Sequence, residues 1–193
     1  MFAIYITHPQ VLIDPATPVP DWGLSERGRE RSLLAASAGW AGKIGRFVAS
    51  TERKAIETAD ILCAGRVAVE TDHAMGENDR SATGFLPPDA FEDAADWFFA
   101  HPAESFHGWE RAVDAQARIV SAVERVLAGH DPAVPIAFVG HGGVGTLLKC
   151  RLNGTPIRRD GDQPPGGGNL FAFRLADRSV TCDWTPMESW RGF

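Results

Sequence analysis

Two histidines and one arginine stand at similar places along the chain, each soon after a short apolar run. They are His8, Arg53 and His141. A guanidinium and two imidazoles suit the binding of a phosphate or a carboxylate. Gly142 follows His141 at an expected helix start, where backbone amides add anion-binding groups. Each residue alone is more often a structural hydrogen-bonding group or a surface charge, but their joint placement predicts an anion pocket.

The elements that must position these residues follow from the spacing of the apolar residues. Strands are expected at 2–6, 46–50, 66–70 and 135–139, with a hairpin near the sheet edge at 169–175 and 179–184. Helices are expected at 25–39, from 51 to about 63, at 91–100, at 109–128 and up to Leu152. The apolar face of the second helix comprises Ala55, Ala59, Leu62 and Cys63, and that of the fourth comprises Val113, Ala117, Val120, Val123 and Leu127.

Strands that alternate with helices predict a single α/β domain over residues 1–193. The expected architecture is a three-layer α/β/α sandwich around a mostly parallel central sheet. In such sheets the ligand crevice lies at the carboxyl ends of the strands. We therefore expect His8, Arg53 and His141 to meet there, although they are far apart in the sequence.

Charge and hydropathy argue against several kinds of partner. The net charge is −6 and no basic run is longer than a pair such as Arg158-Arg159, so we expect no nucleic acid. No apolar run approaches the roughly 18 residues of a membrane helix. The start MFAIYITHP has no signal-peptide pattern, so we expect no membrane association and a cytoplasmic protein. Nothing in the sequence indicates an oligomeric state.

The remaining cysteines and histidines predict no metal site and no cofactor. The cysteines are Cys63, Cys150 and Cys182, and their wide spacing favours buried free thiols over disulfides or zinc ligands. The other histidines lack metal-ligand spacing and are expected on the surface or in loops; they are His73, His101, His107 and His130. Trp97, Phe98, Phe99 and Trp109 are expected to pack as core or as a lid over a pocket.

The segment GHGGVG at 140–145 satisfies the GxGxxG pattern of dinucleotide-binding loops. A dinucleotide fold needs a second strand after the following helix, and the sequence there is RRDGDQPPGGG, which has no apolar run. The chain also has no GxSxG elbow and no Walker A sequence. These observations disfavour a dehydrogenase, a serine hydrolase and a P-loop NTPase.

Four segments, in order, resemble the histidine phosphatase superfamily, which has the phosphoglycerate mutase-like fold. The resemblance runs from residue 2 to about 154, and its segments are WGLSERGRERS at 22–32, STERKAIETADIL at 50–62, AESFHGWERAVDAQARI at 103–119 and FVGHGGVGTLL at 138–148. It implies that His8 is a nucleophile that takes up the phosphoryl group. It also implies that Arg53 and His141 bind phosphate without a metal, and that Glu77 is the general acid. Asp79 is an alternative for the acid.

The first motif departs from the family's pattern. The family has Arg-His-Gly, whereas this chain has Thr7-His8-Pro9. Thr7 offers one neutral hydrogen bond where the arginine offers a charged fork, and Pro9 restricts the backbone. Arg80, Arg158 or Arg159 is a candidate to replace the lost charge, whereas Asp14 in the same loop would repel phosphate.

Two functions follow from these residues. The first is a metal-independent phosphatase that acts on a small phosphoester through a phosphohistidine at His8. The second is a weakened family member that binds a phosphorylated or anionic small molecule without efficient turnover. Thr7 and Pro9 motivate the second.

Overall fold

Six strands form one mixed sheet in the computed structural model, which describes residues 1–192. The strands are β1 (Phe2–Thr7), β2 (Arg46–Ala49), β3 (Val69–Thr71), β4 (Ile136–Gly140), β5 (Asn169–Arg174) and β6 (Val180–Pro186). Their order is β3-β2-β4-β1-β5-β6. The first four run parallel, and β5 and β6 add the antiparallel hairpin at one edge. The sheet is therefore mostly parallel, as the sequence predicts.

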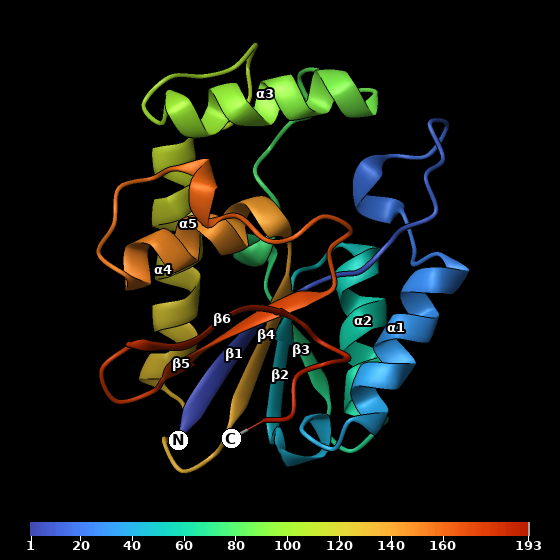
Figure 1. Cartoon of the computed structure of the whole chain (residues 1–193), viewed down its shortest axis with the longest axis vertical. Helices are drawn as coiled ribbons and strands as arrows, with labels where there is room; N and C mark the ends of the chain where they lie inside the picture. Colours follow the sequence, from blue (N-terminus) through green and yellow to red (C-terminus); the bar gives the residue numbers. More distant parts are fainter. Residues whose placement is uncertain (193) are drawn as a thin grey trace.

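Helices cover both faces of this sheet (Figure 1). They are α1 (Glu26–Ser37), α2 (Arg53–Cys63), α3 (Pro88–Ala100), α4 (Ala112–Ala128) and α5 (Gly142–Leu152). In Figure 1, α1 and α2 lie together on one side and α4 and α5 on the other, while α3 crosses beyond the end of the sheet. The expected three-layer α/β/α arrangement is confirmed.

The alternation of side chains along each strand separates the interior into two cores. On β1, Ala3 and Tyr5 join the core beneath α4 and α5, whereas Ile4 and Ile6 join the core beneath α1 and α2. All four side chains are fully buried. A strand buried on both faces has a continuous apolar sequence, which is why FAIYI is recognisable as a central strand.

Two expected elements differ from the structure. The expected strand 66–70 is β3 at Val69–Thr71, because α2 ends in a left-handed turn at Ala64 and Gly65 that delays the strand. The expected apolar face of α4 is rotated, since Val113 and Ala117 are exposed. Val123 and Leu127 of the expected face are buried, and the rest of the buried face is mostly alanine; it comprises Ala112, Ala115, Ile119 and Ala122. Alanine is a weak marker of burial, so the expected face followed the larger side chain of Val113, which is exposed.

The strand order explains which loops meet. β2, β4 and β1 are neighbours in the sheet and run in the same direction. The segments that follow them, which begin at Ser50, His141 and His8, therefore leave the sheet side by side at one end. The backbone confirms this closeness, because the His8 amide donates to the Gly140 carbonyl at 3.0 Å and the Ser50 amide donates to the Val139 carbonyl at 2.9 Å.

Candidate active site

His8 lies at the carboxyl end of β1 and its imidazole has a defined orientation. Its Nδ1 is 2.9 Å from the carbonyl oxygen of Pro9. A carbonyl only accepts, so Nδ1 carries the proton and Nε2 keeps its lone pair. Burial and the neighbouring His141 lower the pKa of His8 to about 3. The imidazole is therefore neutral and nucleophilic at Nε2 across the physiological range.

His141 follows β4 and is completely buried beside His8. The two rings meet edge to face, with centroids 5.3 Å apart. The backbone of His141 is held by the Tyr5 hydroxyl, which accepts from its amide at 3.1 Å and donates to its carbonyl at 3.2 Å. Its Nε2 lies 2.9 Å from Ser50 Oγ and 3.2 Å from Glu52 Oε1. Burial lowers the pKa of His141, against the opposing charges of Glu52 and Glu77.

Lys54 is the basic residue of α2 that reaches this site. Its side chain is buried, its Nζ donates to the Val19 carbonyl at 2.8 Å, and it pairs with Glu52. Burial disfavours the charged form of Glu52, but His141 and Lys54 outweigh it and lower the pKa of Glu52 to about 2. An ion pair therefore stands directly beside His141.

Arg53, the expected phosphate ligand, points away from the two histidines and does not line the cavity that contains Arg80. Its side chain is 61% exposed, and its Nε donates to Glu57 at 2.8 Å. Arg53 begins α2, and successive residues of a helix point about 100° apart. The helix therefore turns Arg53 to solvent and Lys54 to His141.

Glu77 lies against the amino end of α5. Its Oε2 accepts from the Gly143 amide at 3.0 Å, and its Oε1 accepts from the amides of Val144 and Asn78, each at 3.0 Å. Burial raises the pKa of Glu77, but Arg80, His141 and these amides outweigh it, so the net shift is downward. A Cβ on Gly143 would lie 2.8 Å from Glu77 Oε1, so the close contact requires glycine. The helix amides that were expected to bind an anion thus bind this carboxylate.

The segment that carries Glu77 is held from α4. Arg118 donates to the carbonyls of Ala74, Gly76 and Glu77 at 2.9 to 3.1 Å. Asp79, the alternative acid, is exposed and accepts from the Ser81 amide at 2.9 Å. The structure therefore brings Glu77 to His141 and leaves Asp79 at the surface.

Thr7 and Gly142 have structural contacts. Thr7 is fully buried, and its hydroxyl donates to Gln163 Oε1 at 2.6 Å and accepts from the Asn169 amide at 3.0 Å. The side chain of Thr7 thus ties β1 to β5 and the loop before it. Gly142 begins α5, and a Cβ there would lie 2.3 Å from Gln163 Nε2, so the packing of Gln163 requires glycine.

Arg80 is the candidate replacement cation that the structure places at the site. It lines a cavity together with Glu52 and Glu77, and its charge acts on the pKa of both Glu77 and His141. Within residues 1–192 no carboxylate forms an ion pair with it.

The other charged candidates lie in different contacts. Arg159 pairs with Glu92 and with Asp96 of α3. Arg158 pairs with Asp160 at 2.9 Å. Asp14 accepts from the Thr17 hydroxyl at 2.7 Å within its own exposed loop. Asp14, Arg158 and Arg159 do not line the cavity that contains Arg80, although Glu92, the partner of Arg159, does.

The polar groups at the site are not all satisfied by the protein. Over the described part of the chain, two buried side-chain atoms lack a hydrogen-bond partner, Asn78 Nδ2 and His141 Nδ1. Both belong to the site, and buried polar atoms without a partner are rare in folded proteins.

Residues 1–192 contain no group of three or more side chains arranged to hold a metal ion, and none of their helices has the length and hydropathy to span a membrane.

Comparison with known proteins decides the family. The family model of the histidine phosphatase superfamily, branch 1, matches residues 15–177. The chain belongs to the histidine phosphatase superfamily. No curated protein matches it.

Solved structures of similar fold accompany this superfamily assignment. A mycobacterial glucosyl-3-phosphoglycerate phosphatase in complex with inorganic phosphate matches with a TM-score of 0.77 and 22% identity, over 98% of this chain and 99% of that one. Bacillus stearothermophilus YhfR matches with a TM-score of 0.77 and 20% identity, over 96% of this chain and 98% of that one. A putative alpha-ribazole-5'-P phosphatase from Escherichia coli matches with a TM-score of 0.72 and 19% identity, over 100% of this chain and 98% of that one. At these identities the likeness supports the superfamily fold.

Several residues of this superfamily member's site were missed in the sequence. They include Tyr5, Ser50 and Glu52, whose side chains contact His141 from other strands and loops. No local sequence pattern reveals such contacts. Lys54 did leave a signal, because it shares a helix face with Thr58 and Leu62, which are buried. A lysine in an otherwise buried stripe is seldom without a partner.

Proposed function

We propose that this protein is a metal-independent phosphatase that hydrolyses a small phosphomonoester through a phosphohistidine on His8. The observation that carries the proposal is the orientation of His8, whose neutral imidazole keeps Nε2 free because Nδ1 donates to Pro9. A neutral imidazole is a competent nucleophile toward phosphorus, and a covalent intermediate divides a difficult transfer into two easier steps.

In the first step His8 Nε2 attacks phosphorus, and the bond from phosphorus to the ester oxygen breaks with its electron pair on that oxygen. Lys54 and Arg80 supply positive charge for the phosphoryl oxygens, in place of the arginine that Thr7 lacks. His141, with its unpartnered Nδ1, offers a further contact to the transferred group.

In the second step water attacks the phosphohistidine, and the bond from nitrogen to phosphorus breaks to restore His8. Glu77 suits the role of base here, because three backbone amides favour its ionised form. The acid role in the first step requires Glu77 to bind a proton before the ester oxygen leaves.

Phosphate release and covalent labelling test the proposal together. The wild type should release phosphate from p-nitrophenyl phosphate, and quenching in alkaline detergent should trap a phosphoryl label that is stable to base and lost on acid treatment. His8→Asn should lose both, because its amide nitrogen replaces Nδ1 but leaves no nucleophile at Nε2. His73→Asn, at an exposed histidine outside the site, should keep both. Turnover that survives in His8→Asn would exclude this mechanism.

A second candidate is a protein that binds a phosphorylated or anionic small molecule without efficient turnover. Glu52 favours it, because this carboxylate stands beside His141 and neutralises Lys54. With Glu77 also ionised, the negative charges balance Lys54 and Arg80. Binding of inorganic phosphate by calorimetry, with no phosphate release from any ester, would support this candidate over the phosphatase.

A further inference from the structure

A cavity of about 570 Å³ is lined in part by Glu77, Arg80 and Glu52, and Glu52 contacts His141. It is enclosed by the loop after β1, the segment 77–86, the start of α3 and Trp109. Its volume lies within the range of about 300–1,000 Å³ that is usual for pockets that enclose small organic ligands.

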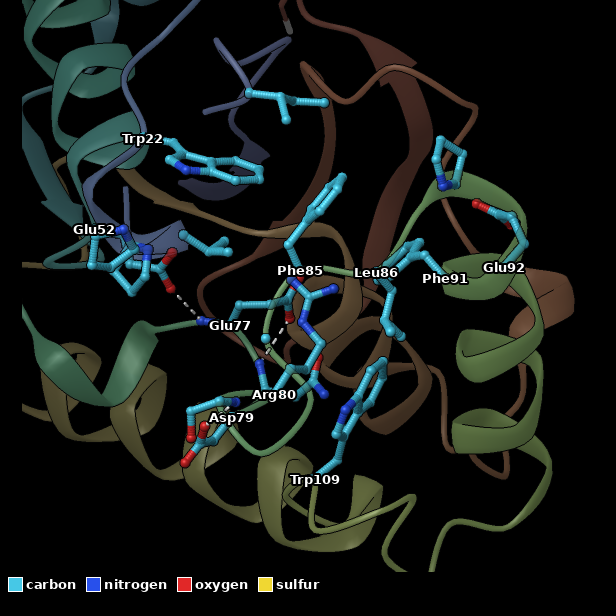
Figure 2. Close-up of a pocket in the computed structure, with 18 residues that line it drawn as sticks. Trp22, Glu52, Glu77, Asp79, Arg80, Phe85, Leu86, Phe91, Glu92 and Trp109 are labelled. Atoms are coloured by element: carbon cyan, nitrogen blue, oxygen red, sulfur yellow. Dashed lines mark hydrogen bonds between the residues drawn. The ribbon is translucent and has the colours of Figure 1, made fainter. Parts of the chain in front are cut away.

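The two ends of the cavity differ in chemistry. Figure 2 shows Glu52 and Glu77 on one side, Leu86 and Phe91 on the other with the carboxylate of Glu92 beside them, and Arg80 between the two sides. The apolar lining comes mostly from large or rigid side chains, which are Ile13, Pro18, Val19, Pro20, Trp22, Phe85, Leu86, Pro88, Phe91 and Trp109. A ligand that fits both ends has an anionic group and an apolar body.

Aromatic rings dominate the apolar end. Trp22 and Phe85 have centroids 5.7 Å apart and planes tilted by 60°. The guanidinium of Arg80 lies over the ring of Phe91 at 4.9 Å and of Trp109 at 5.7 Å. Flat faces and a flat guanidinium favour a flat ligand, because rings gain from stacking and from edge contacts.

The indole N–H groups are not available to a ligand. Trp22 Nε1 donates to the carbonyls of Asp14 and Thr17, each at 2.9 Å, and Trp109 Nε1 donates to Thr83 Oγ1 at 2.8 Å. The tryptophans therefore present carbon surface to the cavity. The polar side chain that Figure 2 shows at this end is Glu92, which already pairs with Arg159. A sugar there would bury most of its hydroxyl groups without partners, which is costly.

We propose that this cavity binds the alcohol portion of the substrate and that this portion is an aromatic ring system, so that the substrates are aryl phosphomonoesters. The inference rests on the proposed phosphatase function and names its substrate class. The phosphoryl group lies at the end of Glu77 and Arg80, and the ring lies between Trp22, Phe85 and Phe91. An aryl ester also suits the ionised Glu77, because a phenolate leaves more readily than an alkoxide without a proton from an acid.

Matched esters test this substrate class. Phenyl phosphate and 2-naphthyl phosphate release alcohols of similar acidity, so their difference reports ring binding. We expect kcat/KM to rise about tenfold from phenyl to naphthyl and to be about a hundredfold lower for glucose 6-phosphate than for phenyl phosphate. Phe85→Ala should reduce the naphthyl-to-phenyl ratio about tenfold. Leu34→Ala removes an exposed apolar side chain from α1, outside the cavity, and should leave the ratio unchanged.

Binding to His8→Asn separates this inference from the proposed catalysis. Calorimetry should show tighter binding of 2-naphthylmethylphosphonate than of methylphosphonate, and Phe85→Ala in the same background should remove the difference. This result without wild-type turnover would keep the ligand class and exclude the phosphatase. Equal kcat/KM for aryl and sugar phosphates, or equal binding of the two phosphonates, would overturn the aryl class. Stronger binding of a phosphotyrosine peptide than of the naphthyl compound would replace the small molecule by a protein partner.

Discussion

His8→Asn should change how the stability of the protein depends on pH. The pKa of His8 falls from its usual 6.5 to about 3 in the folded state, because the partly buried imidazole loses solvation and lies beside His141. Between these values the unfolded chain binds a proton that the folded protein does not. The free energy of unfolding therefore falls as the pH drops from 6.5 towards 3.

The size of this effect follows from the two pKa values. At pH 5 the unfolded imidazole is almost fully protonated, and the linkage amounts to about 2 kcal/mol relative to pH 7. Urea unfolding at pH 7 and pH 5 measures it. The loss on acidification should be about 2 kcal/mol smaller in His8→Asn than in the wild type. An equal loss in wild type and His8→Asn would refute the argument that burial keeps His8 neutral.

Three further perturbations have expected outcomes. Lys54→Ala should lower kcat/KM about a hundredfold, because the buried cation of the site is lost, whereas Arg53→Ala should stay close to wild type; the reverse order in steady-state assays would contradict the placement of the two side chains. Tyr5→Phe should lower the free energy of unfolding by about 1–3 kcal/mol, because the buried His141 amide loses its acceptor. Scanning calorimetry should show a Tm lower by about 2–4 °C per kcal/mol. An unchanged Tm would show that the hydroxyl does not support His141. Glu52→Gln should tighten phosphate binding about tenfold in calorimetry, because one negative charge leaves the site; weaker binding would mean that Glu52 mainly orients Lys54.

The architecture and the two central histidines could be predicted from local sequence patterns. Continuous apolar runs such as FAIYI mark strands that are buried on both faces, and this pattern can be recognised without knowing which strands lie beside them. His8 and His141 directly follow such strands, so the rule that ligands bind at strand ends was enough to pair them. Glu77 was named from the family resemblance, and the structure places it beside His141.

The cation that reaches the site and the residues that surround the site depend on how distant elements pack together. Arg53 and Lys54 are adjacent in the sequence, and the rotation of α2 against the sheet sends one to solvent and the other to His141. The position of Arg80 beside Glu77 depends in the same way on the path of a loop, which local sequence does not encode. The aromatic cavity is assembled from four separate segments. Its shape arises from packing between distant residues, and so no single stretch of sequence contains it.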